Sequence, residues 1–417
     1  MGTLLLKSAI IVDALSRHHL KKRDVLIENG TVTTIAPKIE NASAEIVKLP
    51  NLHISQGWFD SGVSFGEPGH EERETLANGL RVAAHSGFAH VALHASGNPV
   101  AVSKSNIRYL RAKAGASAVS LLPMGALCAG GTSGRLAELY DMHTEGAVAF
   151  YDPKKPLQNP NLLKIALQYV QGFNGLVLSF PMEASVAEKG VMNEGINSTE
   201  LGLRGIPALA EQLRVARDLQ ILEYTGGRLH IPTISTKKSV QLIKEAKKKG
   251  LQVTCSVSIN NLVLTDDALH GYGTRYKLMP PLRTETDRKA LLKALKEGII
   301  DGVTSDHEPM DIEHKKLEFD NANYGSIGLE SCFGALLKQT GVETAVRAFT
   351  NLKKTFGVPE TPIEEGAGAD LTLFDPKPLW EFSERDILST SKNAAMVGQT
   401  LQGRAYGIIN KCKISLK

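Results

Sequence analysis

The side chains with the clearest chemical potential are an adjacent carboxylate and imidazole, Asp306 and His307. A positioned carboxylate can accept a proton from a nucleophile, and a neighbouring imidazole can carry a proton or bind a metal ion. Hydrolysis by metal-activated water needs several imidazole or carboxylate ligands around the ion, plus one open position. The pair therefore indicates hydrolysis only if further ligands converge on it. Without them, we expect both side chains to be hydrogen-bonded to neighbouring backbone.

Histidine and cysteine spacing offers no second chemical site. Three histidines lie at positions 85, 90 and 94, but His90 and His94 would share a face only on a helix. Their segment has the pattern of a strand followed by a loop, so no metal site is predicted there. The four cysteines, at positions 128, 255, 332 and 412, are scattered. This spacing predicts reduced thiols in a cytosolic protein, not a disulfide framework or a zinc ribbon.

A glycine-rich run at residues 130–134 has the composition of a phosphate loop. It lacks the Lys-Ser or Lys-Thr that follows such a loop, and it lacks the dinucleotide spacing. The sequence predicts a turn into a helix from Arg135 instead.

Alternating strands and helices must position all of these groups. Strand-like runs alternate with helical stretches through the middle of the chain, which predicts a mostly parallel sheet with helical crossovers. Seven or eight such units over roughly 300 residues favour a (β/α)8 barrel, whose chemistry lies at the C-terminal ends of the strands. The clearest strand-like runs are residues 89–93, 118–122, 175–178, 251–257 and 299–303, and the clearest helical runs are residues 75–84, 162–170, 206–222, 237–249 and 286–295.

Both ends of the chain are β-rich. Residues 4–12, 24–28 and 32–35 have strand patterns, with Asn29-Gly30 as a hairpin turn between the last two. Residues 369–375 form another strand pattern, and two short ones follow within residues 403–415. Each end therefore predicts a small β module.

The composition is that of an ordinary globular protein, 42% hydrophobic and 22% charged, with a net charge of +4. The short basic runs at residues 21–23 and 247–249 lack interleaved aromatic residues, so no nucleic-acid partner is predicted. The second run ends a helical pattern, where cations complement the helix dipole. No apolar stretch reaches the about 18 residues that a membrane span needs. We expect a cytoplasmic protein that does not contact membranes.

Many short motifs resemble those of dihydroorotases, in the same order along nearly the whole chain. They lie at residues 57–69, 74–75, 87–88, 201–207, 280–284, 301–307, 328–330, 369–371 and 398–404. The resemblance implies an α/β fold: a TIM-like (β/α)8 barrel of the amidohydrolase type, with a small β-sandwich formed by the N- and C-terminal segments. On this basis the barrel spans residues 53–360, and residues 1–52 and 361–417 build the sandwich.

Other residue types occupy the positions that would carry the family's metal ligands. The His-x-His of the first strand has become Gly62 and Ser64, a later ligand histidine has become Phe180, and the second histidine of a His-x-x-His strand has become Thr233. Glycine has no side chain, and a neutral hydroxyl is a poor zinc ligand. Asp152 stays ambiguous as a ligand. No metal or other cofactor is therefore expected.

The resemblance also implies that the substrate contacts are lost. The arginine that would hold the dihydroorotate carboxylate has become glycine, and glycine cannot replace a guanidinium. The altered substrate positions are Gly66, Ser96, Met279 and Met310. Asp306 clearly remains, at the general-base position, and we interpret it as vestigial.

Two functions remain open from the sequence. The first is a pseudoenzyme of pyrimidine biosynthesis that acts as a structural partner of aspartate transcarbamoylase, as metal-ligand-deficient dihydroorotase-like chains do in some bacteria. The family also implies a homodimer or larger assembly. The alternative is an active cyclic amide hydrolase of the dihydroorotase, hydantoinase or allantoinase type, which would convert dihydroorotate and water to N-carbamoyl-aspartate. It would need zinc in a rearranged site, with Asp306 as base and Asp152 or His230 as ligands, or a carbamoylated lysine bridging two metals.

Overall fold

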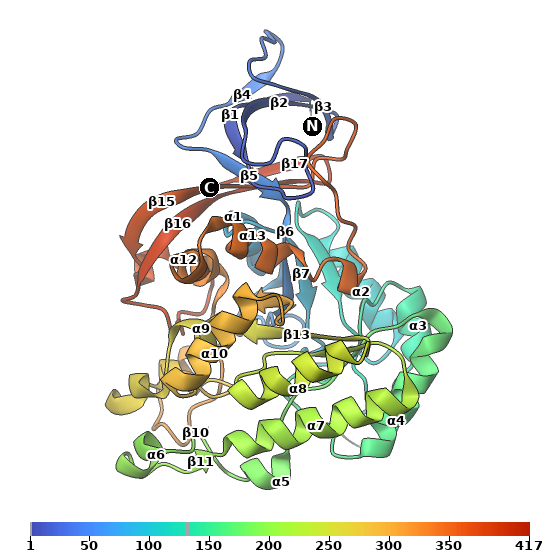
Figure 1. The fold of residues 1–417 in the computed structure, drawn as a ribbon, viewed down its shortest axis with the longest axis vertical. Helices are drawn as coiled ribbons and strands as arrows, with labels where there is room; N and C mark the ends of the chain where they lie inside the picture. The colour runs from blue at the N-terminus through green and yellow to red at the C-terminus, as the bar shows by residue number, and fades with distance from the viewer. Residues whose placement is uncertain (1, 131–133) are drawn as a thin grey trace.

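The chain forms a barrel with a β module attached at the N-terminal ends of the barrel strands, the end called the base below. Both termini lie in that module, which is at the top of Figure 1. The structure is a computed structural model that describes residues 2–130 and 134–417. The turn predicted at residues 130–134 lies largely outside the described residues. The prediction of a helix from Arg135 is wrong, because α3 begins at Leu139.

Eight parallel strands close the barrel, as the alternating pattern predicted. One set is β6 (Trp58–Val63), β7 (Phe88–Leu93) and β8 (Ser120–Pro123). The other is β9 (Val177–Leu178), β12 (Leu229–Ile231), β13 (Val253–Ser258) and β14 (Gly302–Thr304). Residues 149–151 supply the remaining strand, since Phe150 pairs with Gly125 and Val177. At the other seam, Val63 pairs with His307, which closes the ring.

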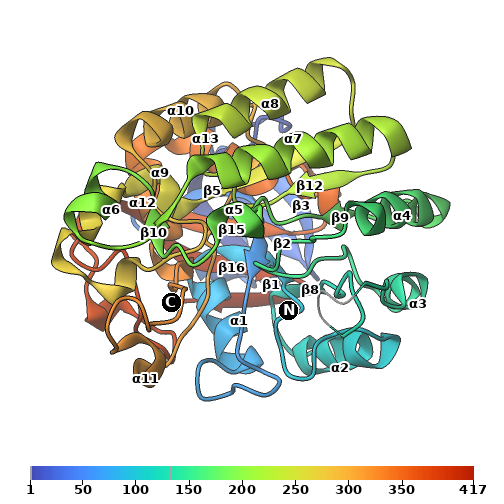
Figure 2. The same cartoon turned by 90° about the horizontal axis from the view of Figure 1, so that it is seen from below.

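Helices surround the barrel (Figure 2). They are α1 (Leu76–His85), α2 (Lys104–Ala114), α3 (Leu139–Thr144), α4 (Pro160–Val170), α5 (Ala184–Ala187), α6 (Ile196–Glu200), α7 (Ala208–Thr225), α8 (Lys237–Lys248), α9 (Ile259–Val263), α10 (Glu285–Lys296), α11 (Ile312–Lys315), α12 (Leu329–Thr340) and α13 (Val342–Thr350). A small ladder of β10 (Met192–Asn193) and β11 (Gly205–Ile206) precedes α7. None of the helices that the structure describes is long and apolar enough to cross a bilayer.

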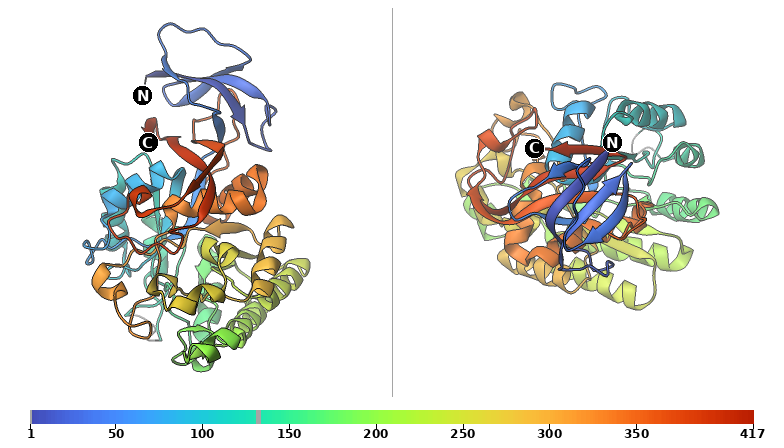
Figure 3. Two further views of the ribbon diagram at one scale, coloured as in Figure 1. Left: turned by 90° about the vertical axis from the view of Figure 1, so that its left-hand side faces the viewer. Right: turned by 90° about the horizontal axis from the view of Figure 1, so that it is seen from above.

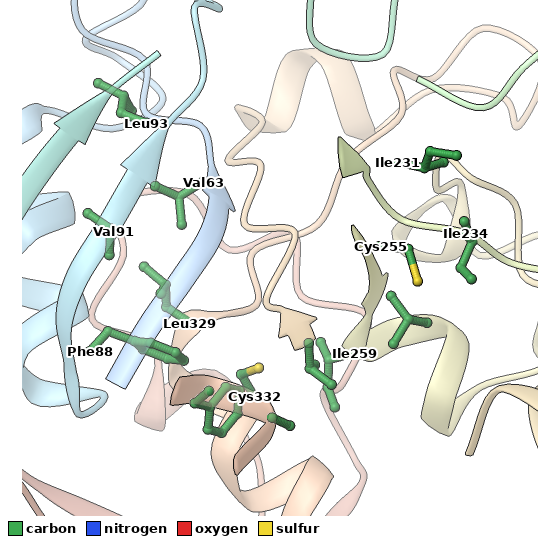
Figure 4. Packing of buried hydrophobic residues seen from close by; sticks show 14 of the residues in the cluster. Val63, Phe88, Val91, Leu93, Ile231, Ile234, Cys255, Ile259, Leu329 and Cys332 are labelled. Carbon is green, nitrogen blue, oxygen red and sulfur yellow. The ribbon is translucent and has the colours of Figure 1, made fainter. Parts of the chain in front are cut away.

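An apolar layer holds the strands to the surrounding helices. Figure 4 shows Val63, Val91 and Leu93 on the first strands, and Cys255 beside Ile231 on the opposite wall. Three of the four cysteines are buried, and all four are free thiols in this structure. Burial of this layer is the main stabilising term for the barrel.

The β module is one hydrogen-bonded sheet that draws strands from both termini (Figure 3). Its strands are β1 (Thr3–Ile11), β2 (Lys22–Glu28), β3 (Thr31–Ala36), β4 (Glu45–Val47), β5 (His53–Gln56), β15 (Leu371–Glu381), β16 (Thr400–Asn410) and β17 (Lys413–Leu416). The predicted hairpin joins β2 and β3, where Asn29 and Gly30 both have positive φ. Leucine, isoleucine and valine side chains from both terminal segments pack together in one hydrophobic core.

Candidate functional site

An ion cluster lies at the C-terminal ends of the barrel strands. The Nζ atom of Lys154 is 3.0 Å from Asp306 Oδ1 and 2.7 Å from Glu308 Oε2. Lys154 follows the strand at residues 149–151, and Asp306 follows β14; both have positive φ. Burial lowers the pKa of an amine, but the two carboxylates hold the pKa of Lys154 above its ordinary value. An ammonium group is therefore paired with Asp306 Oδ1.

Asp306 is a buried carboxylate with several charged side chains close to it. Burial raises its pKa to about 6, and the charges of Glu308 and Asp60 act in the same direction, while Lys154 opposes them. A carboxylate with this pKa could take up a proton near neutral pH. One of its two oxygens, Oδ1, is paired with Lys154.

Both first-strand ligand positions lie against the His94 ring. Ser64 Oγ and His94 Nδ1 lie 3.2 Å apart and share a hydrogen bond. A Cβ atom on Gly62 would lie 2.7 Å from His94 Nε2, so any side chain there would displace the His94 ring. Desolvation lowers the pKa of His94 to about 3, and Lys154 adds to the shift, so the ring is neutral.

Asp60, which precedes these positions on β6, is fully engaged within the barrel. Its carboxylate accepts hydrogen bonds from Thr304 Oγ1 at 2.6 Å, from Ser305 N at 3.0 Å and from Gly62 N at 3.1 Å. Burial raises its pKa. Asp60 therefore ties β6 to β14 and offers no free oxygen to the mouth.

Apolar side chains surround Phe180. Phe180 is buried in a cluster with Phe59, Tyr151 and Leu178, and Met279 packs against the same cluster. The Tyr151 ring meets the His94 ring edge-on, with centroids 5.3 Å apart. The position that the family gives to a ligand histidine is thus part of a hydrophobic core.

The two residual ligand candidates point elsewhere. Asp152 Oδ1 accepts hydrogen bonds from Leu127 N at 3.1 Å and Cys128 N at 3.3 Å, so its carboxylate faces the loop after β8. His230 Nδ1 lies 2.8 Å from Thr254 Oγ1, and its Nε2 lies 3.1 Å from Ser256 Oγ. Burial lowers the pKa of His230 to about 3. Both of its ring nitrogens are therefore occupied by hydroxyl groups of β13.

The remaining substituted positions also lack the groups that a substrate would need. A Cβ atom on Gly66 would lie 1.8 Å from the carbonyl oxygen of His70, so no arginine fits there. Thr233 is buried with positive φ, and Ser96 is exposed beyond the end of β7. Met310 is held by its backbone N–H, which donates to Asn393 Oδ1 at 3.1 Å.

Of the predicted pair, His307 has the expected partner and Asp306 does not. His307 Nδ1 accepts the backbone N–H of Gly328 at 3.2 Å, so backbone groups hold this ring as expected. Asp306 instead pairs with Lys154, a residue that was not predicted as its partner. The one sequence feature that could have pointed to Lys154 was its position two residues after Asp152.

These residues do not fit a zinc ion. Structural and catalytic zinc sites need at least three converging His, Cys, Asp or Glu side chains. Within residues 2–130 and 134–417, no three such side chains are placed to hold a metal ion. A positive ammonium group also sits where a cation would have to approach Asp306.

Comparison with known proteins places the chain in a family. The family described as Dihydro-orotase-like matches residues 54–239. A dihydroorotase of Pelotomaculum thermopropionicum is 36% identical over 97% of this chain and 96% of its own length. One of Geobacter metallireducens is 37% identical over 94% of this chain and 95% of its own.

Solved structures agree on the fold. The L-hydantoinase of Arthrobacter aurescens superposes with a TM-score of 0.87 at 19% identity, covering 100% of this chain and 96% of its own. A D-hydantoinase from Thermus gives a TM-score of 0.83 at 21% identity, covering 99% and 95%. At such identities the likeness concerns the barrel and its β module alone. With the relatives' identity over nearly the full length, it follows that the chain belongs to the dihydroorotase family of the amidohydrolases.

Proposed function

We propose that this chain is a pseudoenzyme of pyrimidine biosynthesis that acts in the cytoplasm as a structural partner of aspartate transcarbamoylase. The observation that supports this most directly is the Lys154 ammonium 3.0 Å from Asp306, where the family's base must be free to take a proton. The metal and substrate contacts are lost while the barrel is intact. A chain of this kind can still serve as a structural scaffold for another protein. A homodimer or larger assembly is part of the same proposal.

The names of the relatives favour the alternative, an active metal-dependent cyclic amide hydrolase. Such an enzyme could use Lys154 as a carbamoylated metal bridge only if its amine first lost its proton. Two carboxylates at 3.0 and 2.7 Å oppose that loss. The geometry therefore supports the non-catalytic function better.

Metal content and turnover distinguish the two functions. The protein, purified without chelators, is analysed for zinc and assayed with dihydroorotate, alone and with added zinc or manganese. The Geobacter metallireducens dihydroorotase serves as the positive control. We expect substoichiometric metal, no turnover, and co-purification of aspartate transcarbamoylase. Stoichiometric zinc, or turnover that Asp306→Asn abolishes, would establish the hydrolase instead.

A further inference from the structure

Four outer helices, α4, α7, α8 and α10, form one flank of the barrel (Figure 2). Each packs against the next in this order. The flank carries none of the residues at the barrel mouth described above. Its surface has two features that the proposed scaffold function does not by itself explain.

The first feature is a concentration of positive charge on α8 and α10. Residues 237–249 and 285–297 hold ten lysine or arginine side chains and four carboxylates, a formal charge of +6. The whole chain carries only +4, so the rest of it is net acidic. Lys238, Lys248 and Lys296 are exposed, and they form no ion pair within the part of the chain that the structure describes.

The second feature is a set of exposed apolar side chains on the neighbouring helices. Leu209 and Leu213 lie one turn apart on α7 and are about half exposed, and Tyr224 on the same helix is 78% exposed. Ile165 and Tyr169 lie one turn apart on α4 and are exposed to a similar degree. Apolar and tyrosine side chains beside a charged rim are the composition of protein–protein interfaces.

We propose that this flank is the docking surface for an acidic face of a partner protein, with α4 and α7 giving apolar anchors and α8 and α10 giving the basic rim. A second copy of this chain is a poor occupant, because a two-fold contact would bring two +6 surfaces together. Apolar anchors also favour a folded protein over a nucleic acid, whose interfaces are far more polar. The inference rests on the proposed function, in that the partner is taken to be aspartate transcarbamoylase.

The test compares two triple charge reversals in the full-length protein. The docking variant is Lys238→Glu, Lys248→Glu and Lys296→Glu. The control is Lys22→Glu, Lys104→Glu and Lys377→Glu, three exposed lysines elsewhere that also form no ion pair within the described residues. Both sets change the net charge equally. Affinity for purified aspartate transcarbamoylase of the same organism is measured by surface plasmon resonance at low and high salt.

We expect the docking variant to bind at least about tenfold more weakly than the wild type, and the control to bind within about twofold. Leu213→Asp with Tyr224→Asp should weaken binding similarly while leaving the circular dichroism spectrum and thermal midpoint unchanged. High salt should weaken the wild type and remove the difference between the two charge variants.

Each other result counts against the docking surface. Equal binding by wild type and both charge variants would overturn it and leave the partnership intact. No binding by the wild type would overturn the partnership and this surface together. Equally tight binding of a DNA duplex to the same flank would show a general polyanion site instead.

Discussion

The barrel carries a buried lysine–carboxylate cluster at each end, and the pKa of the aspartate is shifted in opposite directions in the two clusters. At the base, Asp370 Oδ2 is 2.7 Å from Lys353 Nζ and 2.9 Å from His90 Nε2. Burial would raise the pKa of Asp370, but the hydrogen bond and charge of His90, together with Lys353, lower it to about 2. At the mouth, burial raises the pKa of Asp306 to about 6.

The number of donors for each carboxylate explains why the two pKa values shift in opposite directions. One carboxylate has two donors at the base, whereas two carboxylates share a single ammonium at the mouth, with Asp60 close by. Both donors at the base bind Asp370 Oδ2, whereas Asp370 Oδ1 is buried without a hydrogen-bond partner among the described residues. Conservation of charge pairs at the base of a TIM barrel serves stability, whereas perturbed charge at the mouth is a feature of functional ends. The mouth has therefore kept a perturbed carboxylate although the surrounding groups fit no metal.

The largest effect is expected from removing the ammonium at the base. Lys353→Met leaves Asp370 buried with His90 as its one remaining partner, and breaking a buried pair in this way costs about 3–5 kcal/mol. Urea unfolding measures the loss. Lys354→Met, at the exposed neighbouring position, is the control and should change the free energy of unfolding by less than about 0.5 kcal/mol. A small effect of Lys353→Met would mean that the base cluster is not a stability device.

The pH dependence of stability should have opposite sign for the two clusters. Asp306 binds its proton more tightly in the folded state, so its contribution to stability falls as the pH rises from about 4 to about 6, by up to about 3 kcal/mol. Asp370 binds its proton less tightly when folded, so its contribution, about 2 kcal/mol, is lost as the pH falls from about 4 to about 2.

Urea midpoints across pH 3 to 8 test this for Asp306→Asn. The variant should lose the decline between pH 4 and 6, whereas Asp320→Asn, at an exposed position, should retain it. If the pH profile of stability were unchanged in Asp306→Asn, a different carboxylate would have to be the cause of the decline.

Removing the ammonium at the mouth should cost less than at the base. Lys154→Met is expected to lower stability by about 2 kcal/mol, because Lys154 and Glu308 are partly exposed and Asp306 can respond by taking up a proton. The exposed neighbour Lys155→Met is the matched control. A loss as large as that of Lys353→Met would erase the contrast between the two ends.

The smallest effects come from adding one methyl group at each end. In Gly57→Ala the new Cβ would lie 2.0 Å from Asp370 Oδ1, and in Gly62→Ala it would lie 2.7 Å from His94 Nε2. We expect losses of about 2 and about 1 kcal/mol, since the Asp370 carboxylate is held by two partners and His94 by one hydroxyl. Thermal unfolding gives both values. Adding His94→Ala should remove the penalty of Gly62→Ala, and persistence of that penalty would point to the backbone instead.

The sequence was sufficient for the fold. Hydrophobic periodicity and Asn29-Gly30 predicted the alternating strands and helices and the hairpin, because these depend on local patterns. The closed barrel was predicted from the resemblance that the ordered motifs carry, since periodicity alone does not determine closure. The strand at residues 149–151 was not predicted. It is short, and it is recognisable only by its pairing with Gly125 and Val177.

The sequence by itself also determined that Gly62 and Phe180 offer no metal ligand, since neither side chain can bind a metal ion in any conformation. Only the tertiary structure decided where the remaining charges go. Asp152, the ambiguous candidate, turns its carboxylate to the backbone of Cys128, while Lys154 reaches Asp306 across the mouth. Lys154 and Asp306 are 152 positions apart, and barrel closure brings the segments that carry them together. Charges interact through space, and the chain's order does not reveal which of them burial will bring together.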